Sequence, residues 1–169
     1  MTTQQNPMAD ALSNISQNPF LKSSIRSKKQ NRCSILMVDD DYEYVLILSR
    51  FLASPEVSIE FETDWWEAVN KYPLSKFDLI VSDINMPRYN GRDAFDYVSQ
   101  YLKDVRMIFM TALDDDGIKS FLPERVIKLY PVISKSKGLS YVRSRIQFEL
   151  NHVLEEKRSK MRGKTRLLH

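Results

Sequence analysis

Short apolar runs alternate with helical periods along the chain from Cys33 onward. Before that point, residues 1–30 are rich in Gln, Asn, Ser, Thr and Lys and carry no apolar period apart from Phe20-Leu21. Continuous or alternating apolar residues predict β-strands over 34–38, 57–61, 77–82, 105–110 and 132–134. Apolar residues at helical spacing predict helices over 41–52, 64–72, 92–102 and 139–156, and a helical region over 114–129 that Pro123 interrupts.

This alternation of strands and helices predicts an α/β domain with a parallel sheet covered by helices on both sides. In open sheets of this kind, functional residues lie at the carboxyl ends of the strands. The predicted strand ends are uniformly polar in this sequence, and they hold Asp39-Asp40-Asp41, Asp83, Thr111 and Lys135. We therefore expect the functional site at this edge of the sheet.

Charge divides the chain into a body and two ends. Residues 1–32 carry five basic residues and one acid, and residues 157–169 carry six basic residues and no acid, although the net charge of the chain is only +3. The sequence therefore predicts a disordered or loosely docked basic tail over 1–32, a domain over 33–156, and a basic C-terminal tail over 157–169. Because the predicted domain is acidic, it lacks the pattern of a broad nucleic-acid surface, and nucleic acid is not an expected partner.

Three features of the sequence bear on where the protein works. No run of 18 apolar residues occurs, so no transmembrane segment is predicted. The N-terminus lacks a basic stretch followed by an apolar core, which a secretory signal requires. The single cysteine, Cys33, excludes an internal disulfide and suits a reducing compartment. We expect a cytoplasmic protein.

The acids at the strand ends predict a cation site. Neighbouring parallel strands lie about 4.8 Å apart, so Asp39, Asp40 and Asp83 would repel one another without a cation between them. Mg²⁺ suits such a site because it binds a few carboxylates together with waters and phosphate oxygens. Asp83 could then attack a phosphoryl group and form an acyl phosphate. Lys135 could pair with Asp83 or with the phosphate, and Thr111 could donate a hydrogen bond to the phosphate.

Each of these residues, taken alone, also has a structural explanation. An acid after a strand often caps the next helix, and Asp41 could do so; Thr111 and Lys135 alone would be ordinary loop residues. A phosphatase of the haloacid dehalogenase type also uses a nucleophilic strand-end Asp, but it needs a second acid two residues later as general acid–base. Position 85 is Asn. Polar residues at all four strand ends therefore favour a protein that accepts a phosphoryl group over a phosphatase of this type.

The same residues resemble the receiver domains of two-component response regulators. Val38-Asp39-Asp40 is similar to the acidic pair of that family, and the segment from Phe77 to Pro87, followed by Gly91, resembles its phosphorylation strand and loop. Met110-Thr111-Ala112 resembles the switch motif after strand four, and Ser134-Lys135 resembles the lysine after strand five. The resemblance spans residues 33–155, and its motifs occur in the order of the family.

The resemblance implies a flavodoxin-like, doubly wound, five-stranded parallel sheet with strand order 2-1-3-4-5. It implies that a histidine kinase or a histidine phosphotransfer protein phosphorylates Asp83, and that the domain catalyses only its own phosphorylation and dephosphorylation. Phosphorylation would shift the conformational equilibrium of the domain toward a state in which the surface formed by helix four, strand five and helix five is altered. Thr111 and Lys135 would contact the phosphoryl group. The implied Mg²⁺ ligands are Asp40, Asp83, the backbone carbonyl of Asn85 and, through a water, Asp39.

The sequence departs from the family pattern in three places, all on the expected output face. Val132 stands where the family usually has an aromatic residue. Ser136 stands where it has a proline in a cis bond, a form that costs other residues about 2.5–4 kcal/mol. The glycine that usually precedes strand five is missing, and Pro123 predicts a fourth helix that is short, broken or displaced. An ordinary phosphorylation site with an unusual signalling surface is expected. The alternative is a receiver-like interaction scaffold that is not phosphorylated.

The predicted output is a contact between proteins. The 13 residues after Glu156 are too few for a DNA-binding or enzymatic domain. We therefore expect a stand-alone receiver that contacts a downstream protein target or passes its phosphoryl group to another histidine.

Overall fold

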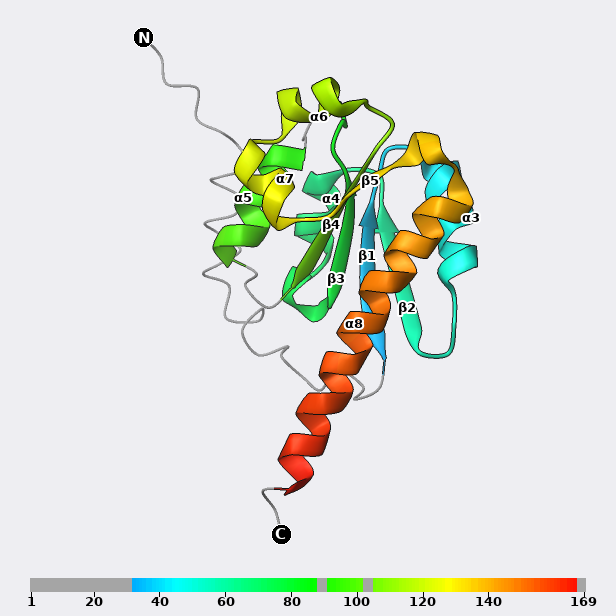
Figure 1. Cartoon of the computed structure of the whole chain (residues 1–169), viewed down its shortest axis with the longest axis vertical. Helices are drawn as coiled ribbons and strands as arrows, with labels where there is room; N and C mark the ends of the chain where they lie inside the picture. The colour runs from blue at the N-terminus through cyan, green and yellow to red at the C-terminus, as the bar shows by residue number, and fades with distance from the viewer. Residues whose placement is uncertain (1–31, 88–90, 102–104, 167–169) are drawn as a thin grey trace.

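The computed structural model describes residues 32–87, 91–101 and 105–166 (Figure 1), so the predicted N-terminal tail lies outside it except for Arg32. The strands are β1 (Cys33–Val38), β2 (Val57–Glu62), β3 (Leu79–Asp83), β4 (Arg106–Thr111) and β5 (Val132–Ser134). The α-helices are α3 (Tyr42–Leu52), α4 (Trp65–Lys71), α5 (Gly91–Tyr101), α6 (Asp115–Phe121), α7 (Glu124–Leu129) and α8 (Leu139–Arg166). Two short 3-10 helices, η1 (Leu74–Lys76) and η2 (Lys135–Lys137), complete the described elements.

The strands form one parallel five-stranded sheet in the order β2-β1-β3-β4-β5, which confirms the predicted doubly wound α/β fold. Its register aligns the carboxyl ends of the central strands. Val38 pairs with Ser82, and Asp83 pairs with Met110. Because of this alignment, residues that follow β1, β3 and β4 along the chain meet at one edge of the sheet.

Two hydrophobic clusters bury the sheet on its two faces. Ile35 and Met37 of β1 belong to the cluster that includes Val45, Leu48 and Leu52 of α3 and Val142, Ile146 and Leu150 of α8. Leu36 and Val38 point the other way, into the cluster that includes Trp65 and Ala68 of α4, Ala94 and Val98 of α5 and Val126 of α7. Successive residues of a strand face opposite sides, so a strand covered on both faces needs the continuous apolar run seen in this sequence.

Acidic caps start several helices. The side chain of Asp41 accepts a hydrogen bond from the Tyr44 N–H, so the capping interpretation of Asp41 is correct. Asp64 caps α4 in the same way, accepting from the Trp66 N–H at 2.7 Å. The predicted interruption at Pro123 is also confirmed, because α6 ends at Phe121 and α7 starts after the proline.

Two predicted boundaries were wrong. The third strand starts at Leu79 and not at Phe77, because the Phe77 N–H donates to the Leu74 carbonyl and closes η1. The last helix does not stop near Glu156 but continues to Arg166.

Ion pairs hold the extended part of α8 against the amino ends of the strands. The Lys157 ammonium lies 2.6 Å from Asp78 Oδ2, and the Arg158 guanidinium lies 2.8 Å from Glu56 Oε1. The two basic residues belong to the segment that the sequence predicted to be a C-terminal tail. The last helix therefore packs against the domain beyond the predicted boundary. None of the described helices, α8 included, is long and apolar enough to cross a bilayer.

Candidate functional site

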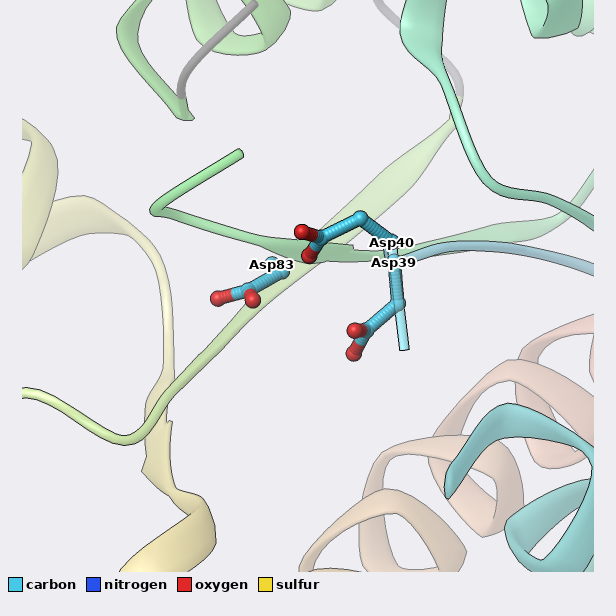
Figure 2. Close-up of side chains that lie close together, drawn as sticks. All are labelled: Asp39, Asp40 and Asp83. Carbon is cyan, nitrogen blue, oxygen red and sulfur yellow. The ribbon is translucent and has the colours of Figure 1, made fainter. Parts of the chain in front are cut away.

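Three carboxylates meet at the carboxyl ends of β1 and β3 (Figure 2). Asp39 and Asp40 follow β1 directly, and Asp83 is the last residue of β3. One carboxylate oxygen from each of the three acids lies within 4.8 Å of the others. The structure therefore brings together the three acids that the sequence predicted to meet.

The three acids differ in exposure. Asp39 is fully buried, Asp83 is 7% exposed, and Asp40 is exposed. Burial raises the pKa of the Asp39 carboxyl to about 6; Lys135 opposes this rise, and the negative charge of Asp83 adds to it. Burial of one acid beside a second acid is costly unless positive charge is close.

Lys135 supplies positive charge to two of the acids. Its Nζ donates a hydrogen bond to Asp83 Oδ2 at 3.0 Å and lies 2.7 Å from Asp39 Oδ2. The side chain is only 13% exposed. Burial disfavours its charge, but the attraction of Asp39 and Asp83 outweighs this effect and raises the pKa of the ammonium above its ordinary value. Lys135 therefore stays charged at neutral pH.

Thr111 and Asn85 are placed near Asp83 by the register of β3 with β4 and by the loop after β3. Thr111 ends β4, is fully buried, and follows Met110, the register partner of Asp83. Its hydroxyl oxygen accepts a hydrogen bond from the Leu113 N–H at 3.0 Å, which leaves the hydroxyl proton available to donate. The Asn85 N–H donates to Asp83 Oδ1 at 3.3 Å, so the loop after β3 folds back over Asp83.

The donor atoms fit a hard divalent cation. Carboxylate oxygens are the ligands that Mg²⁺ prefers, and three carboxylates against one ammonium leave an excess of negative charge. Asp39 Oδ2 is buried and pairs with the Lys135 ammonium at 2.7 Å. The cluster still carries an excess of negative charge, which a hard cation would offset.

Sequence reasoning missed three contacts of this site. The ammonium of Lys135 lies over the ring of Tyr44, 5.0 Å from the ring centroid. On the other side of the sheet, the Trp65 indole N–H donates to Ser82 Oγ at 2.9 Å, and the Ser82 hydroxyl donates to the Asp83 carbonyl oxygen at 2.9 Å. A buried tryptophan needs a partner for its N–H, but the sequence does not say which strand provides it.

A family model for the response regulator receiver domain matches residues 35–136, which is more than half of the chain. The chain belongs to the response regulator receiver family. Chemotaxis protein CheY of Thermotoga maritima is 27% identical to this receiver over 116 residues, covering 60% of this chain and 97% of CheY.

Two further relatives match over a smaller part of their length. Regulatory protein VanRB of Enterococcus faecalis is 32% identical over 83 residues, covering 48% of this chain and 37% of VanRB. Transcription factor SKN7 of Candida albicans is 27% identical over 89 residues, covering 52% of this chain and 16% of SKN7. The chain thus spans only a minor part of these two proteins.

Solved receiver structures share the fold of this receiver. The signal receiver domain of an HD domain-containing protein from Pseudomonas fluorescens Pf-5 superposes with a TM-score of 0.61 at 20% identity, covering 78% of this chain and 93% of that one. A CheY-like receiver domain protein from Methanospirillum hungatei JF-1 superposes with a TM-score of 0.59 at 19% identity, covering 74% and 98%. Both are consistent with the predicted flavodoxin-like architecture.

Proposed function

We propose that this receiver accepts a phosphoryl group on Asp83 from the phosphohistidine of a histidine kinase or histidine phosphotransfer protein. The observation that carries the proposal is the meeting of Asp39, Asp40 and Asp83 with the ammonium of Lys135 at one edge of the sheet. The domain promotes only its own phosphorylation and dephosphorylation and converts no separate substrate.

The transfer exchanges one bond of phosphorus for another. A carboxylate oxygen of Asp83 attacks the phosphorus atom, the P–N bond of the phosphohistidine breaks, and its electron pair returns to the imidazole nitrogen. The product is an acyl phosphate on Asp83. Lys135 pairs with Asp83 before transfer. Its flexible side chain allows the ammonium to move and pair with a negatively charged phosphoryl oxygen after transfer. Thr111 retains a hydroxyl proton that it can donate to the same group.

Mg²⁺ would be held by Asp40, Asp83 and the backbone carbonyl of Asn85, with Asp39 acting through a water. When bound, the ion offsets the negative charge that the phosphoryl group brings to the acids. Asp39 is the buried acid of the set, and the exposed Asp40 lies on the solvent side of the site.

The output is a contact with a downstream protein. A groove with a volume of about 810 Å³ begins at Ala112, directly after Thr111, and runs between α6, α7, β5 and the start of α8. Its lining is mixed: Ile118, Ile127 and Tyr130 are apolar, and Lys119, Lys137 and the acids at 114–116 are charged. Thr111 directly precedes Ala112, so a displacement of Thr111 toward a phosphoryl group would move the first residue of the groove.

Incubation with acetyl phosphate and Mg²⁺, followed by intact-mass measurement, tests the proposal. The wild type is expected to gain one phosphoryl group, and Asp83→Asn is expected to gain none. Asp96→Asn removes an exposed acid of α5, and this control is expected to gain the group like the wild type. EDTA in place of Mg²⁺ should prevent the gain.

The alternative function, an interaction scaffold that is not phosphorylated, makes the opposite prediction. It requires that the wild type gain no mass with acetyl phosphate or with a phosphorylated histidine phosphotransfer protein. That result, obtained with folded protein, would rule out the proposed phosphoryl transfer.

A further inference from the structure

Tyr44 lies at the site in a fixed position. Its N–H donates to Asp41 Oδ1 at 2.9 Å, which ties the first turn of α3 to the end of β1. Its ring packs against the hydrophobic cluster formed by β1, α3 and α8. The ring is therefore held from the backbone and from the core, and it presents a rigid surface to the acids.

The ammonium of Lys135 lies over this ring. The distance from Nζ to the ring centroid is 5.0 Å, within the range of about 6 Å over which an aromatic ring attracts a cation. The same Nζ reaches Asp39 and Asp83. The ammonium thus has three attractive neighbours, two acids and one ring, in a position that is largely shielded from water.

Lys135 is the first residue of η2, and its carbonyl accepts a hydrogen bond from the Gly138 N–H at 3.0 Å, so this segment orders the backbone but not the long side chain. A lysine side chain is a flexible four-carbon stem. Residue 136 is serine, so no following proline restricts the backbone of Lys135. After η2 the chain turns at Gly138 with a φ of 89°, a conformation that glycine adopts without steric cost. The local sequence therefore leaves the direction of the lysine to contacts with other elements.

The ring of Tyr44, and not its hydroxyl, makes the contact. The hydroxyl oxygen is buried and has no hydrogen-bond partner among the described residues, which is a cost to the fold. Burial raises the pKa of this phenol above its ordinary value, so the ring carries no negative charge at neutral pH. A tyrosine at this position is thus useful for its aromatic face.

We propose that Tyr44 is a positioning residue whose ring holds the Lys135 ammonium between Asp39 and Asp83, ready to follow the phosphoryl group. The inference rests on the proposed function for its effect on phosphoryl transfer. The contact itself can be measured without that reaction.

The first test compares initial rates of phosphorylation by acetyl phosphate. Tyr44→Leu keeps an apolar side chain but removes the ring, and the rate is expected to fall by about twofold to thirtyfold, the range that a cation–π contact can account for. Tyr44→Phe is expected to restore the rate, because it keeps the ring and removes only the unpartnered hydroxyl. Tyr44→Met is a second aliphatic variant, in case the leucine variant does not fold.

A matched control is available in the same protein. The guanidinium of Arg143 lies 5.9 Å from the ring centroid of Phe51, on the outside of α3 and α8. Phe51→Leu therefore removes a cation–ring contact outside the acidic site and the groove, and the rate is expected to stay at the wild-type value. In a Lys135→Met background, Tyr44→Leu should cause no further slowing, because the group that it positions is gone.

The second test observes the lysine directly by NMR. The ε-methylene protons of Lys135 are expected to be shifted upfield by the ring in the wild type and in Tyr44→Phe, and to return toward ordinary lysine values in Tyr44→Leu. Equal shifts in all three proteins would overturn the proposal, as would equal phosphorylation rates for the leucine variant and the wild type. A wild type that gains no phosphoryl group would refute the proposed function, and the NMR result would then decide the positioning by itself.

Discussion

Replacement of Lys157 by methionine removes the ammonium that pairs with a carboxylate at the amino ends of the strands. The Asp78 side chain is 5% exposed and that of Lys157 is 18% exposed. Asp78 Oδ2 accepts from the Lys157 ammonium at 2.6 Å and from the Ser34 N–H at 2.9 Å. The same ammonium donates to the carbonyl of Arg32. Lys157 thus joins α8 to β1 and to the segment before β3.

The expected loss of unfolding free energy is about 3 kcal/mol. Breaking a fully buried ion pair by removing one partner costs about 3–5 kcal/mol, and the partial exposure of Lys157 places this pair at the lower end. For a domain of this size, a loss of about 3 kcal/mol lowers Tm by about 10 °C. Urea unfolding followed by circular dichroism measures the free energy, and a thermal melt measures Tm.

Two controls separate the ion pair from other effects. Arg158→Met breaks the neighbouring pair with Glu56, in which both side chains are about half exposed, and should cost about 0.5 kcal/mol. In an Asp78→Asn background, Lys157→Met should cost much less than it does in the wild type. Equal losses for Lys157→Met and Arg158→Met, or a loss below about 1 kcal/mol for the first, would refute this account of α8.

Two other changes have expected outcomes. Trp65→Phe removes the indole N–H that bonds to Ser82 and shrinks a fully buried side chain, so it should cost about 2–3 kcal/mol in urea unfolding; a loss under about 1 kcal/mol would mean that the contact is not part of the stable fold. Mg²⁺ should raise the Tm of the wild type, because an ion that binds only the folded state stabilises it, and the rise should shrink in Asp40→Asn but not in Asp96→Asn. An equal rise in both variants would show that the ion binds elsewhere.

The sequence determined the order and type of the elements and the place of the site. Strand and helix periods are local, and each face of β1 had to be apolar because the sheet is covered on both sides. The acids at 39, 40 and 83 were predictable as a group, because parallel strands bring their carboxyl ends to one edge. The break at Pro123 was predictable from the chemistry of proline alone.

Tertiary structure decided what depends on partners far apart in the chain. The charges of Lys157 and Arg158 resemble those of a solvated tail, and only the presence of Asp78 and Glu56 beside them extends the domain contacts past residue 156. Tyr44 and Lys135 lie far apart in the sequence although their side chains are in contact, so no local sequence pattern predicts the contact between ring and ammonium. Periodicity reports which face of an element is buried, whereas an ion pair or a ring contact depends on the distance between elements, which only the packed fold sets.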